Sequence, residues 1–413
     1  MRKLLMVAFH YPPIRGSSGV QRTLKFSRYL PSLGWQPIVL TAHPRAYASV
    51  GDEQLSEIPA EVPVERAFAL DTARHLSIRG AYVRWMAWPD RWATWWLGAI
   101  PAGLRLIRRH RPQYIWSTYP IATAHLIGLT LHRLTGVPWI ADFRDSMTED
   151  DYPRDPTTRK IYLAIERRAV RHARRLVFVA DSTRRMYLER YPELRPERCL
   201  LIPNGYDESD FADPIFAAPP AEAPNGPLRL LHAGTLYTEE RDARPFLRAL
   251  ARLKGEGTLS AAAARFEFRA SGADRHYGTI IDDLGIGDLV KLLPGVPYQD
   301  VLQECARADA LLLFQGQSCD HQIPAKLYEY LRVGRPILAL TTERGDTGTL
   351  LRQTGGGTII DMADEEAIHS ALPGFLKAVR AQTHPAADRS TVERFTRFNQ
   401  TRDLARNLAE LED

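Results

Sequence analysis

A cation and a carboxylate three residues apart mark the stretch of this chain with the clearest chemical meaning. Lys326 and Glu329 lie in the run IPAKLYEYLRVGRPI, which begins at Ile323. Pro324 suits the first turn of a helix, and free backbone N–H groups at a helix start attract phosphate. Residues three apart share one helix face. The run therefore predicts a nucleotide-linked ligand, with Lys326 at its diphosphate and Glu329 at a sugar hydroxyl. The alternative is an exposed ion pair.

Four segments follow one another in the order typical of one enzyme family. They are the stretch with Gly16 and Gly19 between an expected strand and helix, IPNGYD at 202–207, LHAGTLY with Gly234 at a strand end, and GRPI at 334–337. Together they resemble the GT-B-fold glycosyltransferases, specifically glycosyltransferase family 4, the bacterial glycosyl transferases group 1. The resemblance implies a nucleotide diphosphate sugar as donor, a metal-independent reaction and retention of configuration at the transferred sugar.

Length and composition agree with a soluble chain of two domains. The 413 residues exceed the usual size of one domain, and 45% hydrophobic with 25% charged residues is ordinary for a globular protein. Expected strands alternate with expected helices, which favours parallel sheets with right-handed crossovers. The expected strands span 3–9, 36–40, 114–117, 139–142 and 175–179, then 228–233, 265–270, 289–292, 308–314 and 337–340. The predicted fold class is α/β, with two Rossmann-like domains facing across a cleft.

A proline-rich joint sets the expected domain boundaries. Residues 212–227 contain five prolines and little periodicity, which predicts a linker. The resemblance implies an acceptor domain over 1–211, a nucleotide-sugar donor domain over 228–391, and a C-terminal helix over 392–413 that returns to the N-terminal domain. Open α/β sheets bind ligands at the carboxyl ends of their strands, so the site is expected there.

Two segments of the first half are candidates for the reaction itself. A loop with Gly16 and Gly19 lets backbone N–H groups approach a phosphate or sugar, although a simple turn is the alternative. In DFRDS, Asp142, Arg144 and Asp145 follow an apolar strand and can orient hydroxyls or assist proton transfer. The alternative there is a buried ion-pair network. In resembling transferases this region faces the acceptor and the reacting sugar carbon.

The donor site implied by the resemblance is only partly matched. Related enzymes often have Arg after the glycine matching Gly234, where this chain has Thr235, so we expect Arg241 to supply the second cation. Arg244 is the alternative. Many members also have a Glu where this chain has His321, which leaves the donor sugar open. The resemblance places Val296 against the nucleobase, although core packing would explain it equally well.

Cysteine usage and hydropathy bear on the location of the chain. Cys199, Cys305 and Cys319 are scattered, which argues against a disulfide framework or a zinc site and favours a reducing cytoplasm. No apolar stretch approaches the roughly 20 residues that cross a bilayer. We expect no metal site and no cofactor beyond the donor substrate.

One segment suggests a membrane surface as a partner. Between Arg79 and Arg111 lie five of the eight tryptophans and seven arginines, with Asp90 as the one acid. Tryptophan with arginine suits the interface of an anionic membrane, where a lipid-linked acceptor would be found. The alternative is core tryptophans beside a solvated basic face. Nucleic acid is not favoured, because no nucleic-acid-binding module accompanies a net charge of +5.

The sequence thus predicts a transferase that assembles bacterial surface glycans from nucleotide diphosphate sugars and a glycan or lipid-linked acceptor. Two other functions stay open. A non-hydrolysing nucleotide-sugar epimerase could share the fold and the donor site. A noncatalytic partner subunit is the second, because Thr235 and His321 depart from the family pattern.

Overall fold

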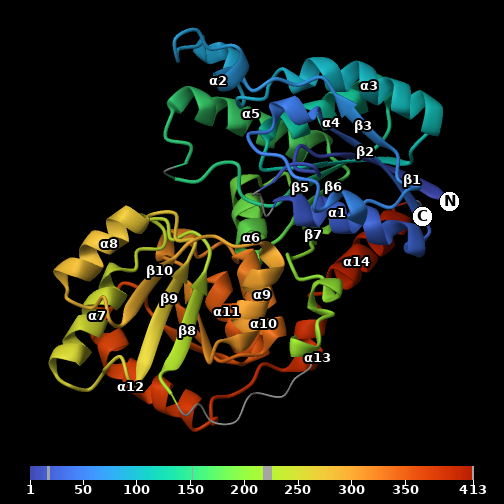
Figure 1. The fold of residues 1–413 in the computed structure, drawn as a ribbon. Coiled ribbons are helices and arrows are strands. Elements are labelled where there is room, and N and C mark those ends of the chain that lie inside the picture. The colour runs from blue at the N-terminus through green and yellow to red at the C-terminus, as the bar shows by residue number, and fades with distance from the viewer. Residues whose placement is uncertain (16–18, 151, 217–225, 412–413) are drawn as a thin grey trace. The chain divides into compact units, whose positions relative to one another are not determined.

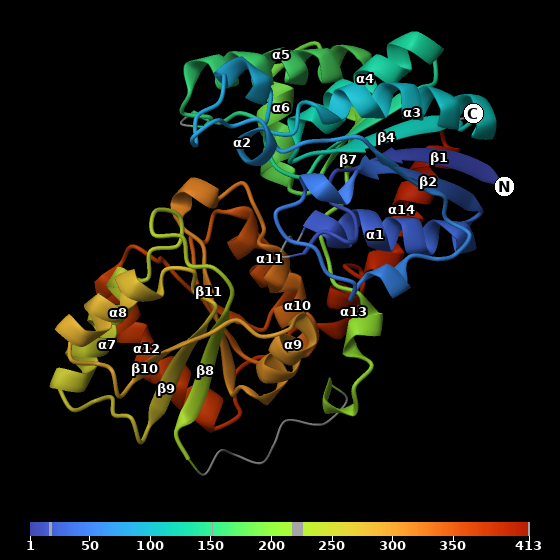
Figure 2. The same ribbon diagram turned by 45° about the horizontal axis from the view of Figure 1, so that its top comes forward.

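The structure is a computed structural model that describes residues 1–15, 19–150, 152–216 and 226–411. The chain divides into two compact units, one formed by Met1–Pro203 with Arg397–Asp413 and the other by Asn204–Thr396. Each unit contains one parallel sheet flanked by helices (Figure 1, Figure 2). The α/β class with two Rossmann-like domains is therefore confirmed, whereas their roles as acceptor and donor domains stay a prediction.

A seven-stranded parallel sheet forms the centre of the first unit, in the order β3-β2-β1-β4-β5-β6-β7. Its strands are β1 (Arg2–Val7), β2 (Trp35–Ala42), β3 (Val64–Ala67), β4 (Tyr114–Thr118), β5 (Trp139–Phe143), β6 (Arg175–Phe178) and β7 (Cys199–Leu201). The chain builds outward from β1 in one direction and from β4 in the other. Open α/β sheets bind ligands at the carboxyl side of such a switch point.

Helices cover both faces of the first sheet. One face carries α1 (Gly19–Tyr29) and α14 (Arg397–Ala409), and the other carries α3 (Trp95–His110), α4 (Ala122–Thr135), α5 (Pro156–His172) and α6 (Asp181–Arg190), with the short α2 (Thr72–His75) between β3 and α3. Alternate residues of β1 serve the two cores, Leu5 and Val7 on the α3 side and Leu4 and Met6 on the α1 side. The central strand is thus buried on both faces.

The second unit repeats this plan with six parallel strands in the order β10-β9-β8-β11-β12-β13. The strands are β8 (Leu228–Ala233), β9 (Ala264–Arg269), β10 (Val290–Leu293), β11 (Ala310–Phe314), β12 (Ile337–Leu340) and β13 (Gly357–Ile360). One face carries α7 (Arg244–Gly255), α8 (Asp274–Asp283) and α12 (Glu365–Arg380), and the other α9 (Tyr298–Arg307), α10 (Ala325–Val333), α11 (Asp346–Thr354) and α13 (Arg389–Glu393). The switch point lies between β8 and β11.

Element boundaries differ from the sequence prediction in two respects. All ten expected strands are present, but β3, β7 and β13 were not expected. The expected single helix over 392–413 is wrong, because α13 ends at Glu393 and α14 begins at Arg397. The residues between them join an earlier part of the chain: the Tyr206 backbone N–H donates to the Phe395 carbonyl at 3.2 Å, and Tyr206 forms a bridge with Thr396.

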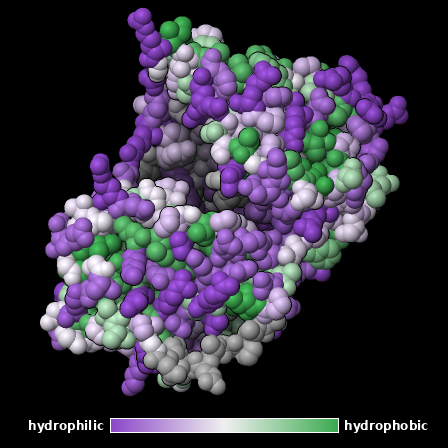
Figure 3. Space-filling model, viewed as in Figure 1, coloured by the Kyte–Doolittle hydropathy of each residue, from purple (hydrophilic) through white to green (hydrophobic). Residues whose placement is uncertain are grey.

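Polar residues cover most of one face of the molecule (Figure 3). Hydrophilic residues predominate on the face shown in Figure 3, and hydrophobic residues form small separate patches. No helix in the described part of the chain is both long and apolar enough to cross a bilayer. The segment from Arg79 to Arg111 is divided: Trp95 is fully buried, whereas Trp85 is 65% exposed. Some of its arginines are ion-paired, Arg91 with Asp71 among them. A membrane contact by this segment stays a prediction.

Candidate functional site

In the second unit, the candidate site lies at the carboxyl edge of the sheet, at the switch point between β8 and β11. Gly234 directly follows β8, and Lys326 lies in the first turn of α10, which follows β11. Gly234 has a φ of +104°, and a Cβ there would come within 2.8 Å of the Lys326 Nζ. The positive φ favours glycine at this strand end, and the Lys326 amine lies directly over its backbone.

Lys326 lies in a site that disfavours its own charge. Its Nζ is 3.3 Å from His232 Nε2. Burial, followed by the Arg241 charge, lowers the pKa of Lys326 to about 7. His232 is fully buried on β8, with Nδ1 2.9 Å from the Leu312 carbonyl oxygen. Burial and the nearby Lys326 hold the pKa of His232 well below its usual value, so its ring is neutral. An arriving anion would relieve the cost of charging Lys326.

Arg241 supplies a second cation at this edge. Its Nη1 donates to the Thr235 carbonyl at 3.1 Å, and its guanidinium lies 5.1 Å from the centre of the Tyr237 ring. The buried Nε has no hydrogen-bond partner among the described residues. Arg244, the alternative from sequence, is instead paired with Asp242 at 2.7 Å. The geometry favours Arg241 over Arg244 as the second cation beside Lys326, because Arg244 is already paired with a carboxylate.

The first turn of α10 adds backbone donors to the two cations. Pro324 precedes the helix and provides no side-chain cap. Uncapped N–H groups at the positive end of a nine-residue helix, beside Lys326 and Arg241, form an arrangement that suits an anion such as a diphosphate.

The other predicted donor residues are Glu329 within α10, His321 before it, and Val296 in the loop after β10. Glu329 lies one turn after Lys326, and its Oε1 accepts a hydrogen bond from the Tyr298 hydroxyl at 2.8 Å. His321 lies in the turn before α10, where its Nε2 is 3.4 Å from the Gln322 side-chain amide. Val296 lies in the loop after β10, and both His321 and Val296 are half-buried. All of these residues belong to connections that leave the carboxyl edge of the second sheet.

A cavity opens at the same edge of the second sheet. It has a volume of about 590 Å³ and is lined by residues of the segment 272–280 at the start of α8, which follows β9. Its lining residues have no distinctive spacing, so the sequence did not predict it. It is an open depression beside β9, the strand that neighbours β8.

In the first unit, Asp142 lies in a buried ion pair. Its two carboxylate oxygens accept hydrogen bonds from Arg22 Nε and Nη2 at 3.0 and 2.8 Å. Thr118 also donates to this carboxylate at 2.8 Å. Both Arg22 and Asp142 have fully buried side chains. Asp142 therefore connects the end of β5 to α1 and β4, and Arg22, which the sequence analysis did not select, is its main partner.

Arg144 joins the end of β5 to the start of α1. Its Nη1 donates to the Gly19 carbonyl at 2.8 Å. Burial lowers the pKa of Arg144, and its Nε has no hydrogen-bond partner among the described residues. His10, directly after β1, has its pKa lowered to about 3 by burial and by the Arg144 charge. Asp145 is half-buried beside them. Gly16 lies outside the described residues.

Comparisons with known proteins bear on the family and the fold of the chain. Residues 18–205 match the family model described as a glycosyl transferase 4-like domain. This match falls almost entirely within the first unit. A search of the curated proteins gives no significant match.

Solved structures resemble the chain over its whole length. Sucrose-phosphate synthase from Thermosynechococcus elongatus is 13% identical with a TM-score of 0.68, covering 100% of this chain and 99% of its own. HepE from Anabaena, in complex with UDP-glucose, is 14% identical with a TM-score of 0.66 and coverages of 99% and 100%. WaaG, a glycosyltransferase involved in lipopolysaccharide biosynthesis, is 14% identical with a TM-score of 0.61 and coverages of 100% and 98%. These likenesses establish the GT-B fold. The family match and the fold support a glycosyltransferase of the GT-B type, and the predicted resemblance is confirmed.

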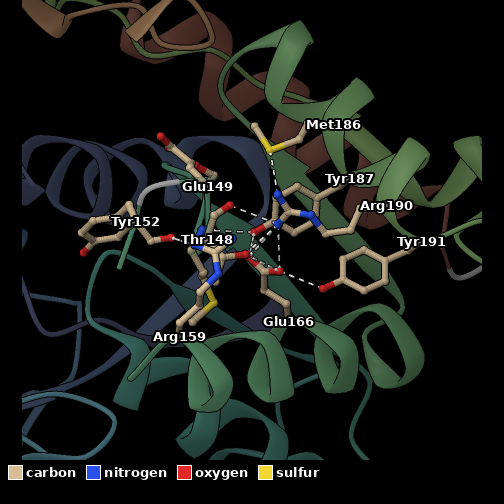
Figure 4. Close-up of polar contacts among 11 residues, drawn as sticks. Thr148, Glu149, Tyr152, Arg159, Glu166, Met186, Tyr187, Arg190 and Tyr191 are labelled. Atoms are coloured by element: carbon tan, nitrogen blue, oxygen red, sulfur yellow. Dashed lines mark hydrogen bonds and ion pairs between the residues drawn. The ribbon is translucent and has the colours of Figure 1, made fainter. Parts of the chain in front are cut away.

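In the first unit, a buried carboxylate holds the connection between β5 and α5. Figure 4 shows hydroxyl groups and an arginine converging on Glu166 of α5. Thr148 donates to Glu166 at 3.0 Å, Tyr187 at 2.7 Å and Tyr191 at 2.8 Å, and Arg190 is paired with it at 3.1 Å. Glu166 is fully buried. This Glu166 cluster ties the segment that follows Arg144 and Asp145 to α5 and α6.

Proposed function

We propose that the protein is a metal-independent, retaining glycosyltransferase. It would move a sugar from a nucleotide diphosphate sugar to a glycan or lipid-linked acceptor during the assembly of bacterial surface polysaccharide. The observation that carries the proposal is the meeting of Lys326, Arg241 and the uncapped start of α10 around Gly234, at the switch point of the second sheet.

The proposed chemistry rests on positioning and electrostatics. As the sugar leaves its donor, negative charge develops on the departing diphosphate, and preorganised cations and helix N–H groups stabilise that charge. Lys326 and Arg241 provide these cations, which supports a reaction without a divalent metal. Glu329, oriented by the Tyr298 hydroxyl at 2.8 Å, would accept from the ribose. Gly234 would bring backbone close to the phosphates, while Val296 and His321 would contact the base and the sugar.

The roles in the first unit follow from burial. Asp142 is fully enclosed and bonded through both oxygens, so we propose that it positions Arg22 and the strand ends. Arg144 and the half-buried Asp145 would contact the acceptor or the reacting sugar, and Gly19, the first residue of α1, would lie near the transferred sugar. Retention of configuration rests on the family 4-like resemblance alone.

The relatives support the donor and the pathway. HepE is described in complexes with UDP, with UDP and glucose, and with UDP-glucose, and WaaG acts in lipopolysaccharide biosynthesis. By analogy, a uridine diphosphate sugar is the first donor to test, with no separate cofactor. The proposed location is the cytoplasm, at the inner face of the membrane, where a lipid-linked acceptor would be reached.

The test is product analysis with a panel of nucleotide diphosphate sugars. One donor should release nucleoside diphosphate only when an acceptor glycan or lipid-linked glycan is added. The NMR spectrum of the product should show that the anomeric configuration is retained. An epimerised nucleotide sugar without any acceptor would indicate an epimerase. A noncatalytic partner subunit, the function that Thr235 and His321 favour, would bind the nucleotide weakly or not at all and form no product.

A further inference from the structure

A second basic site lies in the first unit, in a cavity of about 450 Å³. Five arginines line it: Arg171, Arg174, Arg175, Arg195 and Arg198. His132 and His172 line it as well, and no carboxylate is among the lining residues. We call these residues the arginine cavity. Such a density of like charge around one cavity is electrostatically unfavourable unless an anion enters it.

The arginine cavity lies at the opposite edge of the first sheet from the candidate site. Its residues come from the ends of α4 and α5 and from the segments that enter β5, β6 and β7. All strands of this sheet are parallel, so their starts share one edge and their carboxyl ends share the other. Gly19 and Arg144 follow the carboxyl ends of β1 and β5. Within the first unit, the cavity is therefore separate from the edge that holds Gly19 and Arg144.

The floor of the arginine cavity is built by anchored side chains. Arg198 Nη2 donates to the Val170 carbonyl at 2.6 Å and to the Ala173 carbonyl, at the end of α5. Arg133 Nη2 is 3.0 Å from His172 Nε2, which therefore accepts as a neutral ring. Burial, followed by surrounding positive charges, lowers the pKa of His172. These contacts fix the orientation of the groups at the base of the cavity.

The charges that face the arginine cavity are poorly balanced. Arg171, Arg174 and Arg195 are exposed and make no ion pair or side-chain hydrogen bond with any described residue. Burial and neighbouring arginines lower the pKa of Arg175 and of Arg198. Glu410 partly offsets Arg175, but it also lies 4.0 Å from Arg406. Net positive charge therefore remains at the mouth of the cavity.

We propose that the arginine cavity binds the phosphate group of a second ligand, away from the donor site. The planar guanidinium presents paired N–H donors that match phosphate oxygens, and the three unpaired arginines at the mouth are available for this geometry. Two sources carry such a group: a soluble phosphorylated compound or the headgroup of an anionic lipid. The proposal does not depend on the transferase activity.

The experiment uses inorganic pyrophosphate as probe in calorimetric titrations of the full chain at low salt. Pyrophosphate also suits the Lys326 site, so two sites are expected in the unchanged protein. Lys326→Ala should remove one, and the triple change Arg171→Gln, Arg174→Gln and Arg195→Gln should weaken the other at least tenfold. The matched control replaces three exposed arginines of the second unit, Arg265, Arg389 and Arg394, by Gln and should retain both sites.

A second arm separates the two sources with vesicles of phosphatidylcholine alone or with added phosphatidic acid. Sedimentation that needs phosphatidic acid and is lost in the triple variant assigns the site to a lipid headgroup. Pyrophosphate binding without sedimentation assigns it to a soluble compound. Equal losses in the triple variant and its control would reduce the effect to general surface charge and overturn the proposal. The proposal also fails if neither probe binds at a site that responds to the triple change.

Discussion

At the scale of single residues, the buried position of Lys326 predicts that ligand binding is accompanied by a measurable uptake of protons. Its pKa is lowered to about 7 by burial and by Arg241, so at neutral pH part of the free protein carries an uncharged amine. A bound diphosphate favours the ammonium form and raises this pKa again. Binding of a nucleotide diphosphate sugar at pH 7 should therefore take up about half a proton.

Calorimetry in buffers of different ionisation enthalpy measures this uptake directly. Affinity should also fall as the pH rises from about 6 to 8, because the free lysine loses its charge in that window. Lys326→Met should abolish both the uptake and the pH dependence. A wild-type affinity that is constant over this range would show that Lys326 does not titrate on binding.

The same lowered pKa predicts a slope in stability. The unfolded chain binds the lysine proton more tightly than the folded one, so this residue makes unfolding easier at low pH. The destabilisation caused by Lys326 declines as the pH rises from about 7 towards 10.5. The free energy of unfolding should therefore rise over that interval. Urea unfolding of the wild type and of Lys326→Met at several pH values tests this, since only the wild type should show this contribution.

Asp142 yields a prediction that tests whether this residue stabilises the fold. Asp142→Ala would leave Arg22 charged and unpaired in a fully buried site, which should cost about 3 to 5 kcal/mol of unfolding free energy. Asp145→Ala, at a half-buried position in the same segment, serves as the control and should cost much less. Urea unfolding measures both values. An Asp142→Ala variant as stable as the wild type would contradict the structural role given to this ion pair.

At the scale of elements, the Glu166 cluster holds the β5–α5 connection. Glu166→Ala removes the acceptor shared by Thr148, Tyr187 and Tyr191 and leaves Arg190 without its carboxylate. The expected loss is about 3 to 5 kcal/mol of unfolding free energy. The control, Glu189→Ala on the same helix pair, changes an exposed side chain and should stay within about 0.5 kcal/mol. Similar losses for both variants would show that the Glu166 cluster does not stabilise this connection.

The sequence predicted central strands better than edge strands, for a physical reason. Strands such as β1 and β11 are buried on both faces and appear as continuous apolar runs. The three unexpected strands lie at sheet edges and are short: VERA in β3, CLL in β7 and GTII in β13. A short edge strand buries few of its residues, so its sequence pattern does not differ clearly from that of a loop.

The candidate site was predictable where its residues are neighbours in sequence. Lys326 and Glu329 share one helix, and Gly234 ends a recognisable strand. His232 was not selected, because its contacts with Leu312 and Lys326 join positions 80 and 94 residues away. The one signal available was a histidine within the largely apolar strand β8. The Arg22 pairing with Asp142 spans 120 residues and left no signal in the spacing of either residue.

At the scale of the whole molecule, the division into two units predicts which part of the chain a bound nucleotide protects. The proposed diphosphate contacts all belong to the second unit, Asn204–Thr396. A nucleoside diphosphate should therefore slow amide hydrogen exchange in 234–241 and at the start of α10, because bound ligand suppresses local opening there. Exchange by mass spectrometry measures this. Protection confined to the first unit would place the nucleotide elsewhere.

The central claim is that Lys326 binds the diphosphate of a nucleotide sugar, and calorimetric titration tests it most directly. A nucleoside diphosphate that binds the wild type is compared with its nucleoside, in Lys326→Ala and in the control Lys291→Ala, which changes an exposed lysine of the same unit. Lys326→Ala should weaken the diphosphate by about 1.5 to 3 kcal/mol, the worth of a charge-assisted hydrogen bond, and leave the nucleoside unchanged. The control should alter neither. Equal losses for both ligands in Lys326→Ala, or a wild type that binds no nucleoside diphosphate, would contradict the account.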